Sequence, residues 1–446
     1  MDGKHAVRVT FVYRAWQLLS GLLSLFFVTS FYSAEVQGYY FTFVSLLTIQ
    51  TVFELGITYV ITTVTAHEMV GTSWKPFDAA PPPRDVASRL SALFHVIWRR
   101  ALKLVIGFIL VVTVLGFMVM RTEKASAHHE WVTPWVLVVA FYGLKICITL
   151  FEGFLEGMSQ VKLVARTRLF SSLATSVTLW AGISAGAGLY AVAISAAISV
   201  AVSLMIYRCK FLPLALRLYR HEERPPAAKI WDSKTQSFQT RMAISWICGY
   251  VVFQTLVPIA FYFLGAVEAG RIGLSLSLCS AVTAIGSAWI GPKVPELSRL
   301  AKELNLDALK ECLRRMLKEV GSVNLLLVVL IAVGNEVVPL FSTKLADRLP
   351  NGSTLLILLI ATVANQYITV IATFSRSFKI DPFAWPTAFS ACVSILLGIY
   401  LTRTMGATGA AAAYGLSMLV GLFPFSVYRH ILLESGSSKF YGAKGQ

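Results

Sequence analysis

Charged side chains are scarce in this sequence. Only 14% of its 446 residues are Asp, Glu, Lys or Arg, whereas soluble globular chains carry about 25%. Hydrophobic residues make up 56% of the chain. So little polar surface cannot keep a chain of this length in water. The composition therefore excludes a soluble protein and indicates one that lies mostly in lipid.

The signatures of several enzyme classes are also missing. The chain has no Gly-rich GxxxxGK loop, which argues against ATP hydrolysis. Its six cysteines have no spacing typical of a metal site or of a disulfide framework. His128, His129 and Glu130 are all metal-ligand types, but no further ligand follows them at helical spacing. We therefore predict no enzymatic activity, no cofactor and no bound metal.

Long apolar stretches are what the sequence has instead. A helix needs about 20 apolar residues to cross a bilayer, and stretches of this kind lie near residues 11–31, 39–65, 101–120, 131–155, 168–187, 189–207, 242–263, 270–291, 320–341, 354–373, 383–401 and 408–428. We expect an all-α, polytopic membrane protein with about twelve transmembrane helices.

The positive charges lie almost entirely on one side of these helices. If the N-terminus is cytoplasmic, 32 of the 39 Lys and Arg residues fall in cytoplasmic segments and six on the opposite side, with Lys145 inside a helix. This asymmetry is the positive-inside pattern of membrane proteins. It places both termini in the cytoplasm, and it explains the net charge of +16 without a nucleic acid partner.

A basic connector between the sixth and seventh stretches divides the chain. We predict an N-terminal six-helix bundle over 1–215, a cytoplasmic connector over 216–234 and a C-terminal six-helix bundle over 235–446. A faint repeat supports two halves, because SAEVQGYYFTFVSL at 33–46 is similar to AVEAGRIGLSLSL at 266–278. Parallel repeats of this kind place the substrate path between the halves. The leucine spacing over 296–318 predicts an amphipathic helix on the membrane surface.

Charged and polar residues inside the predicted helices are costly in lipid, and each is therefore a functional candidate. In the fourth stretch Lys145, Glu152 and Glu156 share one face, which suits an anionic head group, an ion gradient or a structural salt bridge. The second stretch carries a polar face that predicts a polar interior or, for Glu54, a bond to a neighbouring helix. Its members are Gln50, Glu54, Thr58, Thr62 and Thr65.

Three further features stand out. Arg14 and Arg241 enter the first helices of the two halves near the cytoplasmic face, where they bind substrate or extend to the interface. Pro258 predicts a kink in the seventh stretch. The tenth stretch has an uncharged polar face that suits sugar hydroxyls or other helices, made by Thr362, Asn365, Gln366, Thr369 and Thr373.

Residues 13–68 resemble the polysaccharide-unit (O-antigen type) flippases of the multidrug, oligosaccharidyl-lipid and polysaccharide exporter superfamily. The similarity covers about 55 residues, and the rest of the chain agrees in its twelve-helix layout and basic central connector. The residues that carry the resemblance are Glu35, Gln37, Gly38, Tyr39, Tyr40, Glu54, Leu55, Gly56, His67 and Glu68.

The resemblance implies a MATE-like fold, with two bundles around a cavity that opens alternately to each side of a bacterial inner membrane. The implied substrate is an oligosaccharide on a polyprenyl pyrophosphate, destined for lipopolysaccharide. Movement would use a proton or sodium ion rather than ATP, and a glycan polymerase and export proteins are implied partners. A diphosphate needs cations, for which Arg14, Lys145 and Arg241 are the candidates, while Glu54 and Glu152 are candidates for ion coupling or the cavity.

Three other functions remain open from the sequence. An ion-coupled exporter of small amphipathic molecules would have the same fold and would use Glu54 or Glu152 as its coupling carboxylate. Only Lys145 lies firmly inside the membrane as a cation, which is few for an anionic substrate and keeps this alternative open. A glycan polymerase or ligase usually has a large outer loop, which this sequence lacks. A scaffold within a glycan-synthesis complex is the fourth interpretation.

Overall fold

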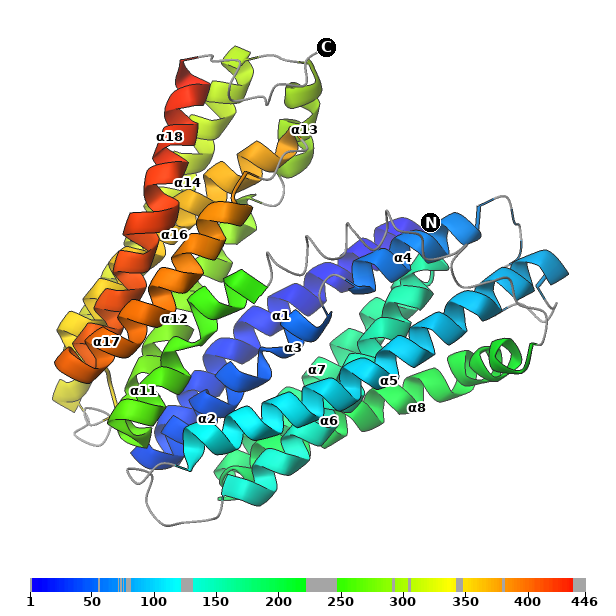
Figure 1. The fold of residues 1–446 in the computed structure, drawn as a ribbon, viewed down its shortest axis with the longest axis horizontal. Helices are drawn as coiled ribbons and strands as arrows, with labels where there is room; N and C mark the ends of the chain where they lie inside the picture. Colours follow the sequence, from blue (N-terminus) through cyan, green and yellow to red (C-terminus); the bar gives the residue numbers. More distant parts are fainter. Residues whose placement is uncertain are drawn as a thin grey trace. The chain divides into compact units, whose positions relative to one another are not determined.

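The computed structural model describes residues 2–435 except 55–56, 71, 73, 75, 78–81, 122–130, 222–246, 291–292, 304–305, 342–347 and 379–381. All its elements in these ranges are helices (Figure 1). They are α1 Asp2–Phe31, α2 Ala34–Leu47, α3 Gln50–Glu54, α4 Ile57–Glu68, α5 Arg84–Met120, α6 Val132–Gly157, α7 Val161–Ser184, α8 Tyr190–Arg220, the helix Ile247–Gln254, α11 Leu256–Leu264, α12 Ala266–Ile290, α13 Val294–Glu303, α14 Leu306–Phe341, α16 Gly352–Ser377, α17 Ala384–Ser417, a π-helical turn Met418–Leu422, and α18 Phe423–Glu434.

Eight helices in the described ranges are long and apolar enough to cross a membrane, or nine if one bent pair is a single span. The prediction was about twelve, and three features explain the difference. The stretch Ala384–Glu434 counts once, although Gly406 at φ 65° divides it by a kink. Helix α7 has cations in its first two turns, and the segment α2 to α4 is interrupted.

The helices group by their contacts into two units. Among the described residues, the first contains those of 2–32, 46–121, 131–221 and Ile247, and the second contains those of 33–45 and 248–435. Within the first unit α1 and α5 to α8 run alongside one another, as do α12, α14, α16 and α17 within the second (Figure 1). The predicted boundaries of the two bundles stay a prediction, but the contacts place residues 33–45 with the second unit.

Two predicted segments differ in the structure. Helix α8 continues to Arg220, beyond residue 216 where the predicted connector begins. The amphipathic helix predicted over 296–318 is two helices, α13 and the first turns of α14, and α14 continues to Phe341. The leucines of these turns, such as Leu297 and Leu309, are fully buried in protein rather than laid on a membrane surface.

The polar face predicted for residues 50–65 lies on α3 and α4. The threonines of α4 lie against α6: Thr62 donates to the Gly153 carbonyl at 3.1 Å, and a Cβ at Gly157 would overlap Thr65. The threonine part of this face therefore serves close helix packing, because small residues let two backbones approach.

In the second unit α2 packs closely on the start of α12. A Cβ at Gly38 would overlap the backbone of Ala266, and Gly270 faces the backbone of Gly38 in turn. Gln37 donates to the Gly270 carbonyl at 3.3 Å. The two segments that form the faint sequence repeat are therefore packed against each other.

The kink predicted at Pro258 is confirmed. The helices Ile247–Gln254 and α11 meet at an angle of 43°, with the break at Thr255. This is the expected place, because a proline ring clashes with the carbonyl four residues before it and cannot donate a hydrogen bond there.

Candidate functional site

Charged side chains gather inside the first unit where α6, α7 and α8 meet. The Glu152 carboxylate on α6 is only 6% exposed and each of its oxygens has a donor. Arg168 Nε of α7 lies 2.8 Å from Glu152 Oε2, and the Tyr207 hydroxyl of α8 donates to Glu152 Oε1 at 3.0 Å. Because a buried carboxylate is costly unless it is paired, these two donors are what allow Glu152 to lie here.

Arg168 also links a second carboxylate to the first. Its Nη1 atom lies 2.9 Å from Glu156 Oε1. Glu152 and Glu156 are four residues apart and therefore lie one above the other on α6. The guanidinium carries donors in a planar fork, which lets one arginine bridge both. Arg168 is thus held by two carboxylates, which offset its positive charge.

Lys145 occupies the same face of α6 two turns before Glu152, as the sequence spacing predicted. Its ammonium donates to Ser199 Oγ of α8 at 3.4 Å and lies 5.9 Å from the centre of the Tyr142 ring. Ser199 in turn exchanges a hydrogen bond of 2.8 Å with Ser171 of α7. A lysine ammonium has three donors, so Lys145 keeps donors for a further acceptor.

Glu54 joins this group from α3. Gln50 donates to Glu54 Oε1 at 2.7 Å, and Glu54 also interacts electrostatically with Lys145. Its carboxylate is half-buried and accepts fewer hydrogen bonds than Glu152. Among the described carboxylates of this cluster, Glu54 is therefore the one with most capacity to bind a proton or a cation.

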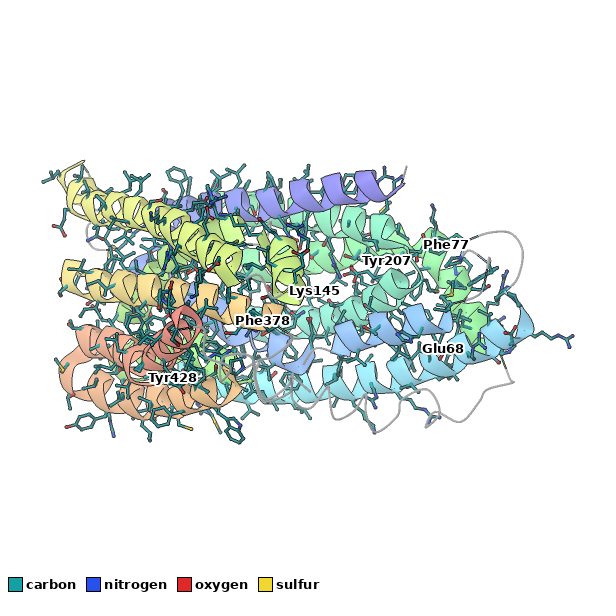
Figure 2. The ribbon with its side chains drawn as sticks, turned by 90° about the horizontal axis from the view of Figure 1, so that it is seen from above. Glu68, Phe77, Lys145, Tyr207, Phe378 and Tyr428 are labelled. Carbon is teal, nitrogen blue, oxygen red and sulfur yellow. The ribbon has the colours of Figure 1, made fainter. Side chains whose placement is uncertain are left out.

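We call Glu54, Lys145, Glu152, Glu156 and Arg168 the N-unit charge cluster. It has three carboxylates and two cations, all from described residues. When all are ionised the cluster has one excess negative charge. In a site of low dielectric constant, one proton or monovalent cation therefore changes the field at Lys145 appreciably. Figure 2 labels Lys145 and Tyr207, which lie within this unit.

The structure brings together some of the predicted residues and not others. Lys145, Glu54 and Glu152 belong to one cluster, whereas the Arg14 side chain is exposed on α1. Arg241 lies outside the described residues, as do His128, His129 and Glu130. The described residues contain no group of three or more His, Cys, Asp or Glu that could hold a metal ion.

Sequence reasoning missed Arg168 and Tyr207. Arg168 lies at the predicted start of the stretch 168–187 and was not singled out, but α7 already begins at Val161. A signal was present, since Ser171 and Thr175 follow Arg168 at helical spacing and continue its polar face. Tyr207 has no such signal, because its role depends on the contact with α6.

The polar face of α16 lies within the second unit and serves helix packing. Thr362 and Gln366 are buried, and Gln366 donates to the Thr283 carbonyl of α12 at 2.9 Å. A Cβ at Gly286 would overlap the amides of Gln366 and Asn324. Of the two interpretations left open for this face, its buried members support bonds to other helices.

No protein-family profile and no curated protein matches this chain. Its structure is similar to an inward-facing multidrug resistance MATE family transporter of the MOP superfamily, with a TM-score of 0.69 and 14% identity over 97% of this chain and 100% of that chain. The lipid II flippase MurJ, in an inward closed conformation, gives a TM-score of 0.60 and 12% identity over 94% of this chain and 87% of that chain. A MOP superfamily transporter from Pyrococcus furiosus gives a TM-score of 0.52 and 14% identity over 96% of this chain and 96% of that chain. These similarities confirm the predicted all-α, MATE-like fold.

Proposed function

We propose that this chain is a membrane flippase that moves a lipid-linked oligosaccharide from the cytoplasmic to the outer leaflet by alternating access. The observation that carries the proposal is a half-buried lysine, Lys145, whose ammonium donates to Ser199 and keeps donors for a ligand, inside a fold shared with transporters and with the lipid II flippase. A cation inside the membrane costs free energy, and such residues usually have a function. A pyrophosphate group supplies the acceptors that Lys145 lacks.

The charge cluster suits a coupled mechanism. While Glu54 is ionised, it offsets part of the charge of Lys145. A proton or sodium ion on Glu54 removes that offset, and Lys145 then attracts an anionic substrate more strongly. Glu152 keeps its pairing with Arg168 throughout and therefore has a structural role in this scheme.

The same proposal places the chain in the inner membrane of a bacterium, with both termini cytoplasmic. The distribution of Lys and Arg supports this orientation. Arg14 and Arg241, near the cytoplasmic ends of the first helices of the two halves, would attract the pyrophosphate on entry. A glycan polymerase and export proteins are the expected partners, because a flipped unit needs enzymes that consume it.

The test is the fate of lipid-linked glycan in a strain without this protein. Complete lipid-linked units should accumulate facing the cytoplasm while surface glycan is lost, and the wild-type gene should reverse both effects. The cytoplasmic orientation is measured by resistance of the glycan to an impermeant glycosidase in spheroplasts. Unchanged surface glycan, with no accumulated intermediate, would contradict the proposal.

A second function is favoured by the excess of carboxylates in the charge cluster. Three carboxylates against two cations among the described residues suit a cationic substrate. An ion-coupled exporter of small amphipathic cations would show increased drug susceptibility on deletion, with surface glycan unchanged. That pair of results separates the two functions in one strain.

A further inference from the structure

A groove of about 510 Å³ lies between α5, α6 and α8 of the first unit. Its volume is in the range of sites that hold small ligands. Its lining is mostly apolar and extends from Leu204 to Ala215 on α8, about 16 Å at the rise of an α-helix. The groove is a feature separate from the ammonium of Lys145, which does not line it.

Four aromatic rings form one wall of this groove. The centre of the Phe151 ring of α6 lies 5.2 Å from that of Phe94 and 6.1 Å from that of Trp98, both of α5. It lies 5.6 Å from the centre of the Phe211 ring of α8. These are distances of rings in contact. Because the rings support one another from three helices, the wall is fixed rather than formed on binding.

The rim of the groove is apolar and exposed. Trp98, Leu204 and Leu212 are exposed, and Met205 is 77% exposed. These residues belong to helices that have the length and composition of membrane spans. A hydrocarbon chain of the bilayer is therefore the molecule that meets this groove. Lipid tails are as apolar as the groove itself, so the choice among lipids depends on the polar group at its mouth.

That polar group is Arg208. It lines the groove and its side chain is exposed. It is the one cation among the described residues that line the groove. The carboxylate in the lining, Glu152, is already paired with Arg168. Basic pockets between transmembrane helices bind the head groups of anionic lipids.

We propose that this groove is a binding site for an anionic phospholipid, with one hydrocarbon chain against the aromatic wall and the phosphate at Arg208. The lipid would also cover Tyr207, whose hydroxyl donates to Glu152. Bound lipid therefore keeps water from the outer side of the charge cluster. The inference does not depend on what the protein transports.

The test uses the full chain in nanodiscs that contain equal amounts of phosphatidylglycerol and phosphatidylcholine. In each of two samples, one of the lipids carries a photoactivatable diazirine on its chain, and the labelled peptides are mapped by mass spectrometry. We expect labelling of residues 147–155 and 204–215 by phosphatidylglycerol, several-fold above labelling by phosphatidylcholine. The Arg208→Gln variant should lose this preference, whereas Arg208→Lys should keep it.

Two matched controls make the result decisive. Arg217→Gln changes an exposed arginine of α8 that does not line the groove, and it should leave the preference unchanged. Ile148→Trp fills the groove and should suppress labelling by either lipid, whereas Leu110→Trp on the exposed face of α5 should not. Equal labelling by the two lipids, or labelling spread evenly over the exposed apolar residues, would mean bulk lipid only and would overturn the proposal. Displacement of phosphatidylglycerol by an equimolar polyprenyl phosphate would also overturn it, in favour of a site for a lipid-linked substrate.

Discussion

The Ser45 hydroxyl of α2 donates a hydrogen bond to the carbonyl oxygen of Gln254. Gln254 lies four residues before Pro258, so its carbonyl is the one that a proline leaves without a helical donor. In lipid, an unsatisfied carbonyl costs several kcal/mol. A side chain 209 residues away along the chain thus completes the backbone of a bent helix.

We expect Ser45→Ala to destabilise the protein by about 1 to 3 kcal/mol, because it leaves that carbonyl without a partner. The double variant Ser45→Ala/Pro258→Ala should recover part of the loss, since residue 258 then supplies an N–H. Thermal unfolding in detergent measures both. The control is Ser280→Ala, an exposed serine bonded within its own helix. Equal losses in the single and double variants would refute the role given to Ser45.

Gly38 and Gly21 form a matched pair for testing how α2 packs. Both lie in helices, but a Cβ at Gly38 would overlap the Ala266 backbone, whereas a Cβ at Gly21 has no neighbour within 4 Å. Gly38→Ala should therefore lower the yield of folded protein severely. Gly21→Ala should be neutral or raise stability by up to ~1 kcal/mol, because alanine favours a helix. Size-exclusion chromatography in detergent compares the yields, and a well-folded Gly38→Ala variant would show that α2 is not packed as described.

Arg168 should matter more for stability than an arginine on the surface. Arg168→Met leaves Glu152 and Glu156 without their cation, and removing one partner of a buried pair costs about 3 to 5 kcal/mol. The Arg168 side chain is 33% exposed, so we expect a loss nearer 2 kcal/mol. Arg315→Met breaks an exposed pair with Glu311 and should cost less than ~1 kcal/mol. Adding Glu152→Gln to Arg168→Met should restore part of the stability, and no such recovery would argue against the pairing.

Lys145→Ala and Glu54→Gln should each abolish transport while leaving folded protein in the membrane. The first removes the half-buried cation and the second removes the carboxylate that would bind the coupling ion. Lys103→Ala, at an exposed lysine of α5, is the control and should transport normally. Surface glycan and the amount of membrane protein are measured in the same complemented strains. Normal glycan with either site variant would remove that residue from the site.

Local spacing in the sequence predicted part of this site. The spacing of Lys145 and Glu152 by seven residues placed both on one face of α6, because that spacing is close to two helical turns. Arg168 was not predicted as a site residue because α7 begins among charged residues, and the sequence alone does not show where the membrane-spanning part of a helix starts. Tyr207 and Ser199 could not be predicted, since their part in the site depends on which helix packs against α6.

The fold shows the same limit. Apolar stretches predicted the helices, and Pro258 predicted the kink. The break between α2 and α3 at residues 48–49 and the docking of residues 33–45 in the second unit were not predicted. Close contacts such as that between Gly38 and Ala266 join segments far apart in the chain, and periodicity in the sequence does not predict them.

The docking of α2 has a consequence for the order of events during synthesis. Gln37 and its acceptor, Gly270, are separated by 233 residues. At about 5 to 20 residues per second, a ribosome needs roughly 10 to 50 s to make that interval. During this time Gly38 of α2 lacks its contact with Ala266 of α12, because α12 has not yet been synthesised. A nascent chain that stops before α12 therefore leaves Gln37 and Gly38 of α2 without the partners that they have in the complete structure.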